Sequence, residues 1–202
     1  MSISGPSKGQ GADAPLPGLG HNRGPSMERG YAYRKHCWSK ARAALVPTLP
    51  LMVLKMRVAR AKELGLDYKT YAGVRASTGR DVIGFLFSSN ALRLVRTELA
   101  EETGRKVAAI REAGKLALVH PPLDPAAVAE ANPTLTDVAA APRFTDPWPQ
   151  MRDTVRGVIR ANGLPSDGVL VIGDTTLERE WSDAGRTAGY LPADRYFGAA
   201  AP

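Results

Sequence analysis

Side chains that cooperate in nucleophilic hydrolysis occur at the ends of three apolar runs in this 202-residue chain. Residues 88–90 (Ser-Ser-Asn) end the run 81–88, His120 ends the run 115–120, and residues 174–176 (Asp-Thr-Thr) follow the run 168–173. A serine, a histidine and a carboxylate can act as nucleophile, base and orienting group. If the runs are parallel strands, their carboxyl ends meet at the edge where open α/β sheets bind ligands. The spacing therefore predicts a hydrolase or phosphate-substrate site that combines Ser88 or Ser89 with His120 and Asp174.

The same residues also have a purely structural interpretation. Neither Ser88 nor Ser89 lies in the G-x-S-x-G pattern of a nucleophile elbow. Asp174 and Thr175 are typical helix caps, and a histidine before two prolines is typical of a loop. Both interpretations stay open at this point, and the sequence assigns no catalytic residue firmly.

The string VLVIGDTTLE (169–178) resembles the second acidic motif of haloacid-dehalogenase-like phosphatases. That resemblance implies an aspartate nucleophile followed by a second aspartate two residues later, at the end of the first strand. The chain contains no D-x-D sequence anywhere. We therefore do not assign the chain to that family.

The positive charge of the chain is concentrated in its first part. Residues 1–80 hold 14 Lys and Arg against 4 Asp and Glu, a balance of +10, whereas residues 81–202 hold 13 against 16, a balance of −3. A basic segment attached to a neutral or acidic body favours an anionic partner, with nucleic acid first and a membrane surface second. A merely solvated basic surface is the alternative.

Within this basic part, the spacing from Ala61 to Val74 is typical of a helix-turn-helix. Ala61 is the small residue of the first helix, Gly65 lies at the turn, and Tyr71 and Val74 anchor the second helix, expected over about 69–77. This interpretation predicts a nucleic-acid-binding surface. Its residues are Lys55, Arg57, Arg60, Lys62, Lys69, Thr70, Arg75 and Ser77.

Residues 1–30 are expected to form a disordered tail, because seven Gly and four Pro leave little apolar surface to bury. Within the tail, residues 17–25 (PGLGHNRGP) do not have the spacing of a dinucleotide-binding loop. We interpret them as a linker or as a short motif that recruits a protein partner.

The remaining pattern predicts an α/β fold. A basic helical segment, residues 31–80, is expected to contain helices at 31–46, from 51 to about 64, and at 69–77. Residues 81–202 are expected to form a small α/β domain with three parallel strands at 81–88, 115–120 and 168–173. Helices are expected from Leu92 to about Ile110, after the Asp124 cap, over 149–161, and after the capping box 175–178. Residues 132–149 read as a surface loop.

The cysteine count, the apolar runs and the missing ligand motifs limit the cellular compartment and the kinds of site that we expect. One cysteine, Cys37, excludes an intrachain disulfide and favours the cytoplasm. No apolar run is long enough to span a membrane, and no metal-ligand spacing or cofactor motif is present, so we expect no metal and no cofactor. The leading functional hypothesis is a non-enzymatic nucleic-acid-binding or regulatory protein. The alternatives are the small α/β hydrolase or phosphate-substrate enzyme, and a structural or adaptor protein.

Overall fold

A computed structural model of the chain describes residues 36–37, 40 and 49–198. The chain divides between Thr48 and Leu49, and the description that follows concerns the second part. The predicted tail 1–30 and the motif 17–25 lie outside the described residues. Of the predicted helix 31–46, residues 36, 37 and 40 are described, and they are helical.

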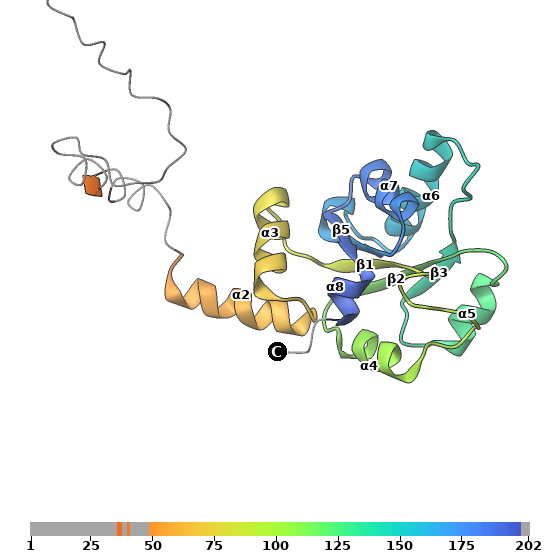
Figure 1. Cartoon of the computed structure of the whole chain (residues 1–202), viewed down its shortest axis with the longest axis horizontal. Helices are drawn as coiled ribbons and strands as arrows, with labels where there is room; N and C mark the ends of the chain where they lie inside the picture. The colour runs from red at the N-terminus through yellow and green to blue at the C-terminus, as the bar shows by residue number, and fades with distance from the viewer. Residues whose placement is uncertain (1–35, 38–39, 41–48, 199–202) are drawn as a thin grey trace, which may run out of the picture. The chain divides into compact units, whose positions relative to one another are not determined.

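The centre of the fold is a parallel sheet of five strands in the order β3-β2-β1-β4-β5 (Figure 1). β1 lies in the middle, and its Leu86 is in register with Leu116 of β2 and with Val171 of β4. β2 and β3 follow β1 toward one edge of the sheet, and β5 follows β4 toward the other edge. The direction in which strands are added therefore reverses between β1 and β4. The strands are β1 (Gly84–Ser88), β2 (Gly114–Val119), β3 (Asp137–Ala140), β4 (Val169–Gly173) and β5 (Gly189–Pro192).

Alternating side chains of the strands build two apolar cores, one on each face of the sheet. Phe85 and Phe87 point to one face, where they pack with residues of α4, α5 and α8, and Leu86 points to the other face, which α6 and α7 cover. Figure 1 shows α6 and α7 on one side of the sheet and α4 and α5 on the other. Because both faces are covered, the three central strands are almost continuous apolar runs, as parallel strands require.

Seven α-helices are described in this part of the chain. α7 begins with the predicted capping box, in which the Thr175 hydroxyl and the Glu178 carboxylate each accept a main-chain N–H. Asp124 caps α5 as predicted. The helices are α2 (Leu51–Glu63), α3 (Tyr68–Thr78), α4 (Glu101–Ala109), α5 (Pro125–Ala131), α6 (Trp148–Ala161), α7 (Thr176–Gly185) and α8 (Ala193–Gly198).

The predicted α/β class is confirmed, but the prediction of three strands was wrong because the sheet has five. The two missed strands, β3 and β5, are the edges of the sheet and are only four residues long. β3 is half-exposed and lies in the segment interpreted as a loop, and β5 contains Gly189 and Pro192. Short, partly exposed edge strands lack the long apolar run on which the prediction depended.

The helix predicted to begin at Leu92 begins instead at Glu101, and residues 89–100 form an ordered loop. The Asn132 side chain holds this loop: its amide donates to the Thr97 carbonyl at 2.6 Å, and its oxygen accepts from the Leu99 N–H at 2.9 Å. Asn132 is buried and distant in sequence, so no local pattern could reveal this competition with the helix.

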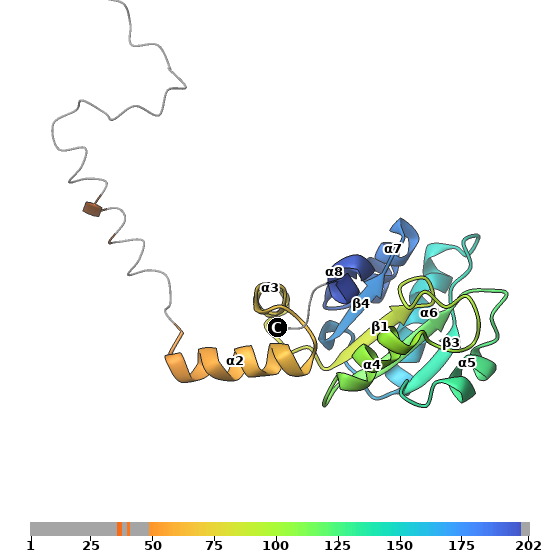
Figure 2. The same ribbon diagram turned by 60° about the horizontal axis from the view of Figure 1, so that its bottom comes forward.

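α2 and α3 form the predicted helical pair, separated by a turn with Gly65 in the left-handed region at φ 67°. Leu64, Leu66 and Tyr71 are buried in the same core as Phe85 and Phe87 of the sheet. Figure 2 shows α2 and α3 beside the sheet end from which β1 begins. Among the described helices, none combines the length and the apolar character needed to cross a membrane.

Candidate active site

Ser89 and His120 meet where β1 and β2 end. Ser89 Oγ lies 2.9 Å from His120 Nδ1 and also accepts the main-chain N–H of His120 at 3.1 Å. The Ser89 N–H continues the sheet by donating to the Leu118 carbonyl. Parallel pairing of β1 with β2 thus places the two residues side by side, although 31 positions separate them in sequence. The predicted convergence of serine and histidine is present in the structure.

Glu178, in the first turn of α7, is the carboxylate nearest the imidazole. Its Oε1 lies 3.9 Å from His120 Nε2 and accepts the Asn90 amide at 2.8 Å. Its Oε2 accepts the N–H groups of Asp174 at 2.6 Å and Thr175 at 2.9 Å. The side chain is fully buried. Three hydrogen bonds therefore hold this carboxylate in one orientation at the switch point between β1 and β4.

Gly173 at the end of β4 makes this approach of Glu178 possible. A Cβ atom at Gly173 would lie 2.8 Å from Glu178 Cβ and 2.7 Å from the Tyr190 ring. Real Cβ atoms do not come that close to such neighbours, so a larger residue would displace either the carboxylate or the tyrosine. The lack of a side chain at Gly173, which ends the predicted strand, thus leaves room for Glu178 in the site.

His120 is partly shielded from water by Trp181 of α7. The two rings stack with centroids 5.3 Å apart and planes 25° apart, and the His120 side chain is 23% exposed. Burial lowers the pKa of His120 below its ordinary value, and the Glu178 charge opposes that shift. The imidazole is therefore neutral at physiological pH. Trp181 is fully buried, and its Nε1 has no hydrogen-bond partner among the described residues.

The tautomer of His120 decides whether the Ser89 hydroxyl donates to Nδ1 or accepts from it. The Glu178 carboxylate lies beside Nε2 and favours the tautomer with its proton there, which leaves Nδ1 as the acceptor for the Ser89 hydroxyl. The remaining imidazole proton is then on Nε2, which faces Glu178. A proton transferred from Ser89 to Nδ1 would create an imidazolium whose charge the buried carboxylate stabilises.

The structure separates the other residues that the sequence suggested for this site. Ser88 is fully buried, and its hydroxyl accepts the Ala91 N–H at 2.9 Å, which stabilises the turn after β1. Asp174 is exposed, and among the described carboxylates Glu178 takes the place beside His120 that we predicted for Asp174. The capping-box pattern identified Glu178 in the sequence. Because capping alone explains a glutamate at this position, no separate pattern in the sequence indicated that Glu178 lies beside His120.

The predicted nucleic-acid-binding residues divide into two groups. Arg60 binds Asp81, Glu63 and three main-chain carbonyls, and Arg75 lies 3.7 Å from Asp81. Thr70 accepts from Arg195, and Ser77 donates to a carbonyl of its own helix. The others, which make no ion pair or side-chain hydrogen bond within the described part of the chain, are Lys55, Arg57, Lys62 and Lys69.

Comparisons with known proteins assign no family: no protein-family model, no curated protein and no solved structure matches the chain. Among residues 36–37, 40 and 49–198, no three His, Cys, Asp or Glu side chains gather as a metal site would require. The geometry at the strand ends and the charge of α2 and α3 are therefore the features that indicate a function.

Proposed function

We propose that the protein is a hydrolase that uses Ser89 as nucleophile and His120 as general base, with Glu178 as the carboxylate that balances the imidazolium charge. The observation that carries the proposal is the 2.9 Å contact between Ser89 Oγ and His120 Nδ1, with Glu178 Oε1 3.9 Å from Nε2. This arrangement lies at the carboxyl ends of three adjacent parallel strands, where open α/β sheets bind their ligands.

The chemistry follows from the proton direction. Ser89 Oγ attacks the electrophilic centre of an ester or phosphate ester while its proton passes to His120 Nδ1, and the same proton then goes to the leaving alcohol. Water, activated by the neutral imidazole, releases the group bound to Ser89. The exposed rim of the site consists of Asn90, Asp174 and Thr175, so a small polar substrate matches it best.

Hydrolysis of p-nitrophenyl acetate and p-nitrophenyl phosphate by the full chain tests this proposal. We expect release of nitrophenol from at least one of the two, and a rate loss of at least about a thousandfold for Ser89→Ala, as for loss of a nucleophile in a triad. His120→Asn, which keeps an acceptor for the serine hydroxyl but no base, should lose a similar factor.

Ser88→Ala is the matched control, because Ser88 lies next to Ser89 but contacts the Ala91 N–H instead of His120. This variant should keep the rate and lose about 1 kcal/mol of stability. Equal activity of wild type and Ser89→Ala, or no turnover of either ester by the wild type, would refute the hydrolase.

Nucleic-acid binding by α2 and α3 is the second candidate function. Lys55, Lys62 and Lys69 are exposed, Arg57 is half-buried, and none has a counter-ion among the described residues. Cations without internal partners on two successive helices are available to phosphates. If α2 and α3 bind nucleic acid, a regulatory role and the recruitment of a protein partner by residues 17–25 are further parts of this proposal. For either function the single cysteine keeps the cytoplasm as the proposed compartment.

A further inference from the structure

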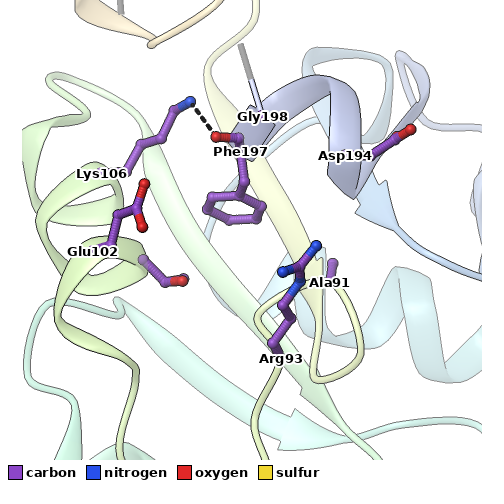
Figure 3. A pocket seen from close by; sticks show the side chains of 8 residues that line it. Ala91, Arg93, Glu102, Lys106, Asp194, Phe197 and Gly198 are labelled. Atoms are coloured by element: carbon purple, nitrogen blue, oxygen red, sulfur yellow. Dashed lines mark hydrogen bonds between the residues drawn. The ribbon is translucent and has the colours of Figure 1, made fainter. Parts of the chain in front are cut away.

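A cavity of about 290 Å³ lies beside the loop that follows β1, between α4 and α8 (Figure 3). Arg93 and Ala91 come from the loop, Glu102 and Lys106 from α4, and Phe197 from α8. A space of this volume is at the small end of ligand pockets, so it suits a metabolite rather than a macromolecule.

Arg93 is held at this cavity by a strained backbone. Its φ is 52°, in the left-handed region that non-glycine residues avoid at a cost of about 1–2 kcal/mol. The loop fixes it through hydrogen bonds from the Leu92 N–H to the Ser88 carbonyl, from its own N–H to the Asn90 carbonyl, and from the Leu94 N–H to the Ser89 carbonyl. Strain of this kind concentrates at functional positions.

Two other non-glycine residues in the described part of the chain, Glu112 and Arg186, have a positive φ. Arg186 is the left-handed residue that ends α7, and the Glu112 carbonyl accepts from the Arg60 guanidinium at 3.0 Å. Arg93 differs because its guanidinium extends into a cavity, as Figure 3 shows, and pairs with no carboxylate among the described residues.

The other charges of the cavity have partners. Lys106 Nζ donates to the Phe197 carbonyl at 3.3 Å and lies 5.4 Å from the Tyr196 ring centroid. Burial lowers the pKa of Lys106, and the charge of Glu102 opposes that shift. Asp194 accepts the Arg195 N–H of its own helix. Arg93 is therefore the cation of the lining whose side chain has no ion pair or hydrogen bond among the described residues.

We propose that this cavity binds a small organic carboxylate, with its carboxylate group on the Arg93 guanidinium and its apolar body against the Phe197 ring. A carboxylate matches a guanidinium through two parallel hydrogen bonds and supplies the counter-ion that Arg93 lacks among the described residues. A phosphate monoester would bring a second negative charge toward Glu102 and Asp194. The proposal concerns binding and stands without the hydrolase.

Titration of the full chain with phenylacetate, followed by ¹H–¹⁵N NMR, tests the proposal. We expect saturable shifts of the Arg93 and Phe197 amides with a dissociation constant on the order of 1 mM, as for a fragment-sized ligand. Arg93→Gln should weaken binding at least tenfold. Phenyl phosphate should bind more weakly than phenylacetate, and benzyl alcohol, which has the ring without the charge, should not saturate.

Arg96→Gln is the matched control, because Arg96 is an exposed arginine of the same loop that does not line the cavity. This variant should bind phenylacetate as the wild type does. If Arg93→Gln lowers the melting temperature, Arg93→Lys replaces it as the test variant. Lysine keeps the positive charge but lacks the planar guanidinium, so we expect a smaller loss of phenylacetate affinity. Absence of saturable shifts, equal losses in the Arg93 and Arg96 variants, or tighter binding of phenyl phosphate would overturn the proposal.

Discussion

The strand-end site and the α2–α3 pair use their charged residues in opposite ways. At the strand ends, one carboxylate, Glu178, is fully buried and receives three hydrogen bonds, while His120 beside it stays neutral. On α2 and α3, charge is abundant, yet the two cations with several partners, Arg60 and Arg75, bind Asp81 within the fold.

This difference teaches that the number of charges in a segment is a poor guide to its chemistry. The +10 balance of residues 1–80 attracts attention in the sequence, but part of that charge stabilises the fold. Glu178 is a single glutamate in a helix cap and is less conspicuous in the sequence. Its burial beside His120 nevertheless gives it the environment of a reactive carboxylate.

The largest effect is expected at Glu178. Glu178→Ala removes the acceptor of the Asp174 and Thr175 N–H groups, and a hydrogen bond to a charged group contributes about 1.5–3 kcal/mol. With loss of the Asn90 contact we expect a destabilisation of about 3 kcal/mol, which corresponds to a melting temperature lower by about 10 °C for a domain of this size. Glu180→Ala, at an exposed position of the same helix, should change stability by less than about 0.5 kcal/mol. Equal melting of the two variants would contradict the central role of Glu178.

A smaller loss of stability is expected at Arg60. Its side chain is 16% exposed and donates to Asp81, Glu63 and the carbonyls of Val82, Arg111 and Glu112. Arg60→Ala should cost about 2 kcal/mol, because charge-assisted hydrogen bonds in a partly buried site are lost. Arg57→Ala, three positions earlier in α2 and without these contacts, should cost less than about 0.5 kcal/mol. Urea denaturation of both variants decides whether these two arginines differ as described.

The pH dependence of stability tests the environment of His120. Burial lowers the pKa of His120 in the folded state, whereas in the unfolded chain it returns to about 6.5. The unfolded state therefore binds the proton more readily, and this contribution to stability is complete above pH 6.5 and lost as the pH falls through the folded-state pKa.

His120→Asn should remove this contribution and flatten the acid side of the stability curve. Urea denaturation from pH 8 to pH 5 measures the difference between the two proteins. Identical pH slopes for wild type and variant would show that His120 keeps an ordinary pKa and does not serve as the neutral base.

The smallest effect is expected for nucleic acid, where the interaction is non-specific. Four phosphate contacts by Lys55, Arg57, Lys62 and Lys69 would give a slope of roughly −3 to −4 for log affinity against log salt on duplex DNA. Lys69→Ala should flatten the slope by about one unit. Arg75→Ala should change it less, because Arg75 lies beside Asp81. Fluorescence anisotropy with labelled duplex and single strands measures the slope, and absence of binding at micromolar protein in low salt excludes this function.

The sequence predicted the parts of the fold whose signals are local. The apolar runs of β1, β2 and β4, the Asp124 cap and the capping box at Thr175 each depend on neighbours in the chain. The edge strands β3 and β5 were missed, because their partners rather than their own residues make them strands.

The site was predictable to a similar extent. Parallel strand ends placed Ser89 beside His120 as expected. The choice of Glu178 over Asp174 depends on the turn after Gly173, which sends the Asp174 N–H toward Glu178. Trp181 and Asn132 act through contacts between distant segments, and no spacing in the sequence indicates them.

Covalent labelling with a fluorophosphonate tests whether Ser89 is an activated nucleophile. A fluorophosphonate reacts when a serine oxygen displaces fluoride, and it requires a base that accepts the serine proton. The hydrolase account predicts one adduct on the native full chain, mapped by peptide mass spectrometry to Ser89, absent after denaturation, retained in Ser88→Ala and lost in Ser89→Ala and His120→Asn. An unlabelled native protein, or an adduct that survives Ser89→Ala, would contradict it.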